Sequence, residues 1–231
     1  MSIIVESDKI VGERMKIITI SLILILFVGL TGCSVIESIL PMTDSPVSGT
    51  ILYADDFSNP KGWGTLGRSG GSIGFDYQGL QIKVDTPNSL FWTVNGGSYK
   101  DVQIDVDAVL LSGPTDDNFG AICRFKDNKN FYGFIVSHDG YFGMFKSIDG
   151  VIYPLLQTEG MQYSEIIRRG GIVNHIQVIC KGTSLTMNVN GEELASVDDS
   201  DLTKGKFGLI AGAYATPGVE VLFDNLLVIQ P

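Results

Sequence analysis

Histidine and cysteine are scarce in this sequence, which has two of the former and three of the latter in 231 residues. Structural zinc sites are built from clusters of these residue types, and neither His138 nor His175 has a cysteine or carboxylate at a metal-ligand spacing. We therefore expect no zinc centre and assign both histidines structural positions. No serine has the surroundings of a nucleophile elbow, so the pattern of an α/β-hydrolase is also missing.

Positive charge is also in short supply. Lysine and arginine number 16 against 26 aspartates and glutamates, which gives a formal net charge of −10. An acidic surface repels phosphate backbones, and no basic patch with interleaved aromatic residues offsets that repulsion. Nucleic acid is therefore excluded as an expected partner.

Helical periodicity is missing beyond residue 33, and the one long hydrophobic run lies near the N-terminus. Ile17–Leu30 contains no charged residue and follows Lys16, which is the layout of an export signal. The run is shorter than the roughly 20 apolar residues that are needed to cross a bilayer, which favours a cleaved signal. An uncleaved N-terminal anchor helix is the alternative. The Leu-Thr-Gly-Cys sequence that ends at Cys33 resembles the lipobox of bacterial lipoproteins. This resemblance implies cleavage before Cys33 and lipid attachment to it.

These features predict three segments. Residues 1–32 form a signal peptide, of which residues 1–14 precede a second possible start at Met15. Residues 33–50 hold the lipidated cysteine and a flexible tether rich in proline, serine, threonine and glycine. Residues 51–231 match one domain that can bury its own core. The protein is expected to be exported and lipid-anchored to the cell membrane or an outer membrane. Ser34 follows the lipidated cysteine at the position where an aspartate would suggest retention in the inner membrane, so the analogy favours the outer membrane where there is one.

Period-two alternation dominates the remaining sequence. In residues 101–108, Val102, Ile104, Val106 and Ala108 share one face, while the intervening Asp and Gln residues share the other and are expected to face water. Asp139-Gly140, Asp149-Gly150 and Asn190-Gly191 separate strand-like runs and predict type I′ hairpins. The pattern predicts an all-β antiparallel two-sheet sandwich of about a dozen short strands.

Several short motifs resemble a known family. They are Asp55-Asp56-Phe57, Asn118-Phe119-Gly120, Cys123-Arg124-Phe125, Asn130 to Phe134, Ser137 to Tyr141, Asn174, Asn190-Gly191, Gly205 to Leu209 and Phe223-Asp224-Asn225. Over residues 51–229 the series resembles the concanavalin A-like jelly rolls of bacterial surface lipoproteins, and is similar to laminin-G-like and 3-keto-disaccharide hydrolase-type domains. The resemblance implies two stacked sheets, one curved face of which often holds glycan, with the strands of Arg124 and Tyr132 on that curved sheet.

Aromatic and polar residues suggest a carbohydrate site, because sugars stack on flat rings and their hydroxyls need polar partners. The predicted ligand-binding residues are Trp92, Arg124, Tyr132, Tyr141 and Lys146. Tyr132 has core packing as an alternative, because one face of Phe131–Val136 must be buried. Trp63, in a loop, is either a lid or a plug.

Two structural features are also predicted. Cys123 and Cys180 form an even pair in an exported domain, which favours a disulfide over two buried thiols. Asp55, Asp56, Asp224 and Asn225 lie where first and last jelly-roll strands commonly pair, and could ligate a structural calcium ion or cap strand ends. No other cofactor is expected.

The predicted function is that of a surface-anchored lipoprotein whose jelly-roll domain binds carbohydrate, with membrane and glycan as partners and without catalysis. A glycan-active hydrolase or lyase on the same fold is one alternative. Asp105-Val106-Asp107 comes nearest to the Glu-x-Asp-x-x-Glu motif of laminarinase-type hydrolases, but the glutamates are missing. A structural or protein-interaction module of the cell envelope is the other alternative.

Overall fold

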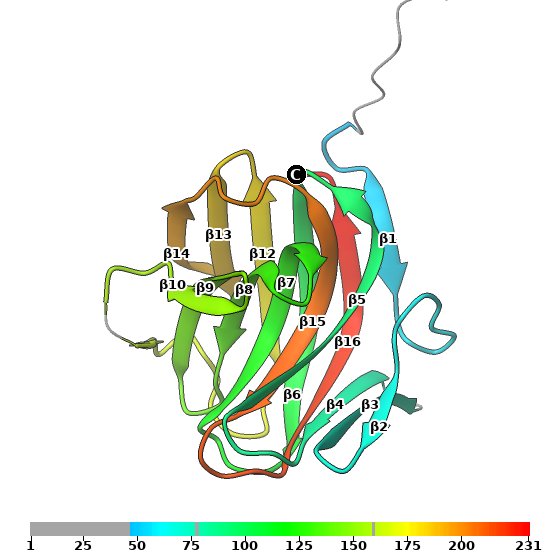
Figure 1. The fold of residues 1–231 in the computed structure, drawn as a ribbon, viewed down its shortest axis with the longest axis vertical. Coiled ribbons are helices and arrows are strands. Elements are labelled where there is room, and N and C mark those ends of the chain that lie inside the picture. The colour runs from blue at the N-terminus through cyan, green and yellow to red at the C-terminus, as the bar shows by residue number, and fades with distance from the viewer. Residues whose placement is uncertain (1–46, 77–78, 159) are drawn as a thin grey trace, which may run out of the picture. The chain divides into compact units, whose positions relative to one another are not determined.

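The computed structural model describes residues 47–76, 79–158 and 160–231, and these contain sixteen β-strands and no helix. No stretch within these ranges is therefore a helix long and apolar enough to cross a membrane. The predicted signal peptide and Cys33 lie outside the described residues. The strands form two antiparallel sheets stacked as a jelly-roll sandwich, as the sequence predicts (Figure 1).

The nine-stranded sheet lies at the back of Figure 1. Its order is β14 (Glu192–Asp198), β13 (Ser184–Val189), β12 (Asn174–Lys181), β6 (Val102–Ser112), β16 (Val219–Ile229), β4 (Gly79–Val84), β3 (Gly71–Asp76) and β2 (Leu66–Arg68). β1 (Ile51–Asp55) also pairs with β16. Next to this pair, the Gly49 amide donates to the Gln230 carbonyl at 2.7 Å and the Gln230 amide donates to the Thr50 carbonyl at 2.9 Å.

The seven-stranded sheet lies in front. Its order is β10 (Val151–Pro154), β9 (Tyr141–Ile148), β8 (Asn130–Val136), β7 (Asp117–Asp127), β15 (Gly205–Ala213) and β5 (Ser89–Tyr99), with β11 (Gln162–Tyr163) paired to β9. This sheet has apolar residues on both faces. Its inner face packs on the other sheet, and its outer face holds a second, smaller hydrophobic cluster.

Alternation builds the core between the sheets. The four apolar residues predicted to share a face of β6 are at most 2% exposed. Asp105 corrects the prediction for the opposite face, because it is only 8% exposed. Gln103 and Gln177 donate hydrogen bonds to its two carboxylate oxygens and cover it, so this part of the outer face is shielded from water.

Two of the three predicted tight hairpins have the expected geometry. Asp149-Gly150 and Asn190-Gly191 both have two consecutive positive φ angles, as type I′ turns require. Asp139-Gly140 does not. Only Gly140 has a positive φ there, and four residues, 137–140, connect β8 to β9. A hydrogen bond from the Ser137 amide to the Tyr141 carbonyl closes this four-residue loop, which takes the place of the two-residue turn predicted from Asp-Gly.

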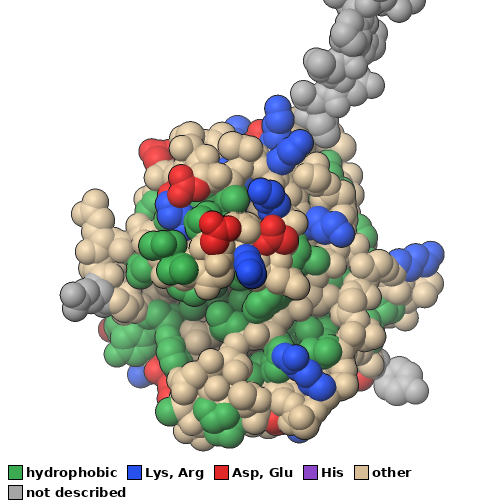
Figure 2. Space-filling view, viewed as in Figure 1, with side chains coloured by type: hydrophobic (Ala, Val, Ile, Leu, Met, Phe, Trp, Pro, Cys, Tyr) green, Lys and Arg blue, Asp and Glu red, His purple; other side chains and the backbone are tan. Residues whose placement is uncertain are grey.

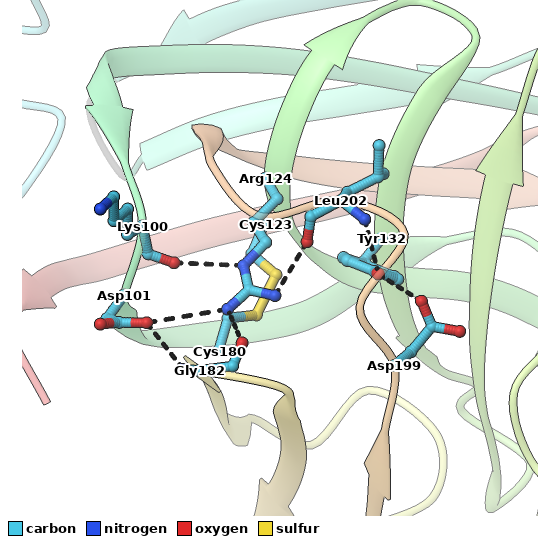
Figure 3. The surroundings of a disulfide bond; sticks show 9 residues. All are labelled: Lys100, Asp101, Cys123, Arg124, Tyr132, Cys180, Gly182, Asp199 and Leu202. Carbon is cyan, nitrogen blue, oxygen red and sulfur yellow. Dashed lines mark hydrogen bonds and ion pairs between the residues drawn. A yellow bond between two sulfur atoms is a disulfide. The ribbon is translucent and has the colours of Figure 1, made fainter.

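A disulfide joins the two sheets. Cys123 of β7 and Cys180 of β12 are bonded across the core with their Cα atoms 6.8 Å apart (Figure 3). Both cysteines are fully buried. The bridge therefore links strands that make no hydrogen bonds to each other and closes a covalent loop around β8 to β11.

Candidate functional site

Arg124 is a structural residue and not a ligand donor as predicted. Its side chain is 1% exposed, and its guanidinium donates to the main-chain carbonyls of Lys100 (3.1 Å), Leu202 (2.9 Å) and Gly182 (2.6 Å). Asp101 lies 3.7 Å away as an ion-pair partner. Figure 3 shows the guanidinium between these three segments, which carry Lys100 and Asp101, Gly182, and Leu202, directly beside the disulfide. The guanidinium is thus bound by protein groups and shielded from solvent.

Tyr132 and Lys146 belong to the same region. The Tyr132 hydroxyl, fully buried, donates to Asp199 and accepts from the Leu202 amide at 3.0 Å. Lys146 binds Asp199 and Asp201 at 2.5 and 2.6 Å. Burial, together with the hydrogen bond to Asp199, raises the pKa of Tyr132 to about 12. Tyr132 is therefore a core residue, which was the alternative to ligand binding. Tyr132 and Lys146 together bind the segment 199–202.

Trp92 lies on the outer face of the seven-stranded sheet. It is half-buried in β5, and its ring packs on Phe131 with centroids 5.4 Å apart. Hollows of about 280 and 300 Å³ flank it, and both are also lined by Leu66 and Asn128. Arg68 borders one of them. A ring exposed between two hollows, beside an amide and a guanidinium, is an arrangement that can stack a flat apolar ligand face and bind hydroxyls.

Tyr141 lies apart from the other predicted residues. It is 41% exposed at the start of β9 and packs edge-on against Tyr163, with ring centroids 5.5 Å apart. A hollow of about 240 Å³ lies against it, bordered by Ser137, Asp139 and Tyr214. The five predicted ligand-binding residues are thus found in three places: Trp92 and Tyr141 border separate hollows, and Arg124, Tyr132 and Lys146 lie together elsewhere.

An apolar groove lies next to the Trp92 hollows. It encloses about 260 Å³ and is lined by Asn88, Ser89, Leu90, Asn118, Ile135, Phe145, Ile152, Ala213 and Tyr214. Leu90 also borders a Trp92 hollow, so the two are adjacent. Figure 2 shows hydrophobic side chains gathered across the middle of this face, with charged side chains above them. The outer face of this sheet is therefore the candidate binding surface.

Glycines shape the floor of the apolar groove. A Cβ at Gly133 would lie 2.3 Å from the Phe145 ring, and one at Gly212 would lie 2.4 Å from the Leu90 side chain. The Phe145 ring and the Leu90 side chain thus occupy the space over these glycines that a larger residue would need.

The four predicted calcium ligands are engaged within the protein. Asp55 accepts from Tyr53, Trp63 and the Phe57 amide, and Asp56 accepts from Ser58. Asp224 accepts from the Asn225 amide, and Asn225 donates to Asp107. Among the described residues, no group of three or more His, Cys, Asp or Glu side chains is arranged to hold a metal ion. Trp63, bonded to Asp55 and packed on Phe57 and Phe207, is a plug and not a lid.

Two carboxylate–histidine contacts lie away from the candidate surface. Asp117 and His138 are fully buried with 2.6 Å between Oδ2 and Nδ1, and the imidazole stacks on Phe119. Burial raises the pKa of Asp117, although its hydrogen bonds with His138 oppose that shift. On the other sheet, Asp107 contacts His175 at 2.8 Å. The first pair is closed to a ligand, and the second belongs to the hydrogen-bonded network that covers Asp105.

Sequence reasoning missed most of the candidate surface, namely Arg68, Leu90, Asn118, Asn128, Ile135 and Phe145. One signal was present. Phe131–Val136 is apolar on both faces, which indicates a strand covered on both sides. The outward set, Phe131 and Ile135, belongs to the second hydrophobic cluster on which Trp92 packs.

No protein-family model and no curated protein sequence matches the chain. Solved structures resemble it in fold. The carbohydrate binding module CBM66 from Bacillus subtilis has a TM-score of 0.61 and 18% identity, over 74% of this chain and 98% of the module. A Bacillus subtilis protein of unknown function with a galectin-like fold has a TM-score of 0.59 and 15% identity, over 80% and 97% of the two chains. The carbohydrate recognition domain of Emp47p has a TM-score of 0.53 and 14% identity, over 80% and 99%. At these identities the likeness establishes the sandwich fold and nothing finer.

Proposed function

We propose that this protein binds carbohydrate on the outer face of its seven-stranded sheet. The observation that carries the proposal is Trp92, a partly exposed indole between two hollows, each of a size to admit a sugar ring. Asn128 and Arg68 provide hydrogen-bonding groups beside it. The names of two structural relatives, a carbohydrate binding module and a carbohydrate recognition domain, support the same class of ligand.

The lining favours binding over turnover. The residues that border the Trp92 hollows include an amide, a guanidinium and threonines, and none of them is an aspartate or glutamate. Glycoside hydrolysis usually places two carboxylates across the bond that is cleaved. A binding module is therefore the function that this surface supports best.

The test is a glycan array probed with the full chain in lipid nanodiscs, in wild-type and Trp92→Ala forms. Loss of the stacking ring should weaken binding on the order of tenfold. Tyr153→Ala, which removes an exposed aromatic ring from the edge strand β10, is the matched control and should bind like the wild type. A blank array with folded protein would overturn the proposal and direct attention to β10, whose apolar residues are about half exposed.

We also propose that the domain is exported and anchored by lipid on Cys33. The support is the order of Lys16, the uncharged run and Leu30-Thr31-Gly32-Cys33 in the sequence. More than one acyl chain on that cysteine would make the attachment lasting. Intact mass should show cleavage before Cys33 together with acylation, and a Cys33→Ser chain that still gives the acylated product would refute the anchor.

A further inference from the structure

A hollow of about 400 Å³ on the outer face of the seven-stranded sheet is bordered by three lysines, Lys126, Lys204 and Lys206, and is here called the lysine hollow. Phe207 belongs to the core, so the alternation of β15 places Lys206 on the outer face. All three lysines are exposed, and none of them forms an ion pair with a described carboxylate. Figure 2 shows Lys and Arg side chains gathered on the upper part of this face, with some acidic side chains among them.

The charge of the lysine hollow is opposite to that of the whole protein, in which 26 acidic residues face 16 basic ones. Asp201 is the one carboxylate among the residues that line the hollow, and Lys146 binds it at 2.6 Å. Asp127 accepts a hydrogen bond from the Lys129 amide at 2.8 Å, and the charge of Lys126 affects it less than that bond does. Because the Debye length is about 8 Å at physiological ionic strength, nearby lysines act on a bound group more strongly than distant acids do. The hollow therefore suits one negatively charged group of a ligand.

Phe125 connects the lysine hollow to the Trp92 hollows. Its ring packs on Phe131 with centroids 5.9 Å apart, and Trp92 packs on the same Phe131 ring. Phe125 also borders both the lysine hollow and one Trp92 hollow, so the two are adjacent. Ser98 and Thr203, both exposed in the lining, provide hydroxyl groups for hydrogen bonds to a sugar. A ligand that stacks one sugar ring on Trp92 can thus extend across Phe125 to the lysines.

We propose that the lysine hollow binds the negatively charged group of an acidic sugar, such as the carboxylate of a uronic acid, in an oligosaccharide whose neighbouring ring stacks on Trp92. The inference rests on the proposed function and extends it to a class of glycan. Each lysine ammonium group is a compact charge with three rotatable donors, and it binds a carboxylate or a sulfate alike. The net charge of −10 opposes a densely charged polymer. The ligand therefore carries isolated negative groups among neutral rings.

The test uses an array of matched glycans that differ at one position only, where they have a neutral hexose, the corresponding uronic acid or a sulfate ester of the hexose. The full chain in phosphatidylcholine nanodiscs, whose lipid has no net charge, should bind an acidic member about tenfold more tightly than the neutral one. Lys204→Gln combined with Lys206→Gln should abolish that preference and leave binding of the neutral member unchanged. Lys83→Gln combined with Lys181→Gln is the matched control, because it removes the same charge from the other sheet and should keep the preference.

The outcomes separate this inference from the proposed function. A preference for either acidic member supports the inference, and the member that is preferred identifies the carboxylate or the sulfate. Equal binding of the acidic and neutral members overturns the assignment and leaves carbohydrate binding intact. A preference that survives in the Lys204 and Lys206 variant, or that the control variant also loses, overturns it in the same way. An array without any bound glycan overturns both proposals.

Discussion

Replacing Arg124 by methionine tests whether this buried cation stabilises the fold. The variant loses three hydrogen bonds from a guanidinium to main-chain carbonyls and leaves those carbonyls without their donor. Hydrogen bonds that involve a charged group contribute about 1.5–3 kcal/mol each, and apolar packing of methionine recovers part of the loss. Arg124 has a φ of 50°, a strain that both side chains share and that therefore cancels. We expect a net loss of about 4 kcal/mol.

For a domain of this size, that loss corresponds to a decrease in Tm of about 10 °C. Thermal and urea unfolding of the full chain, followed by near-ultraviolet circular dichroism, measure it. Arg68→Met is the control, because Arg68 is exposed and stacks over Phe91 at 4.7 Å, and should cost less than about 1 kcal/mol. Unfolding of Arg124→Met within about 2 °C of the wild type would refute the structural role. Loss of glycan binding by the folded variant would restore the prediction made from sequence.

Two further predictions concern the same region. Replacing both Cys123 and Cys180 by alanine opens a covalent loop of 57 residues, and chain entropy predicts a loss of about 4 kcal/mol in the free energy of unfolding. Urea unfolding of the variant and the wild type, with and without reductant, measures this loss. A difference in the free energy of unfolding below about 1 kcal/mol would contradict the entropic account. Tyr132 has a pKa raised from its ordinary value of 10.0 to about 12, first by burial and then by Asp199. The folded state thus retains the phenol proton longer than the unfolded state, so stability falls as the pH rises from 10 to 12. Tyr132→Phe should show a smaller decline between those pH values in urea unfolding, and an equal decline in both proteins would count against this assignment.

The sequence predicts strands better than it predicts how strands associate. The apolar face of residues 102–108 and the Asn190-Gly191 turn are local features, and the structure confirms both. The pairing of β6 with β12 spans more than sixty residues, and the pairings of β16 with β6 and β4 span more than a hundred. No local pattern encodes those neighbours. The resemblance to jelly rolls supplied the architecture that periodicity alone could not.

The candidate site was predicted less well, for two physical reasons. Arg124 lies where the pairing of β7 with β8 shifts register, and its positive φ redirects a side chain that regular alternation would place on the outer face. Tyr132 lies on a strand that is apolar on both faces, where alternation cannot tell which set faces the core. Asn118 has no distinctive local signal, because it lines the apolar groove only through the residues that the fold places around it.

The pairing of β1 with β16 brings the two ends of this domain together. Because Gly49 and Gln230 are joined by a hydrogen bond, the chain enters and leaves the folded body at nearly the same point. Such a body can be spliced into a surface loop of another protein without stretching its host, since its two ends already meet. The same closeness suits a circular permutation. A few added residues would join the two ends, new ends would be made at the Asn190-Gly191 turn, and every strand would keep its neighbours.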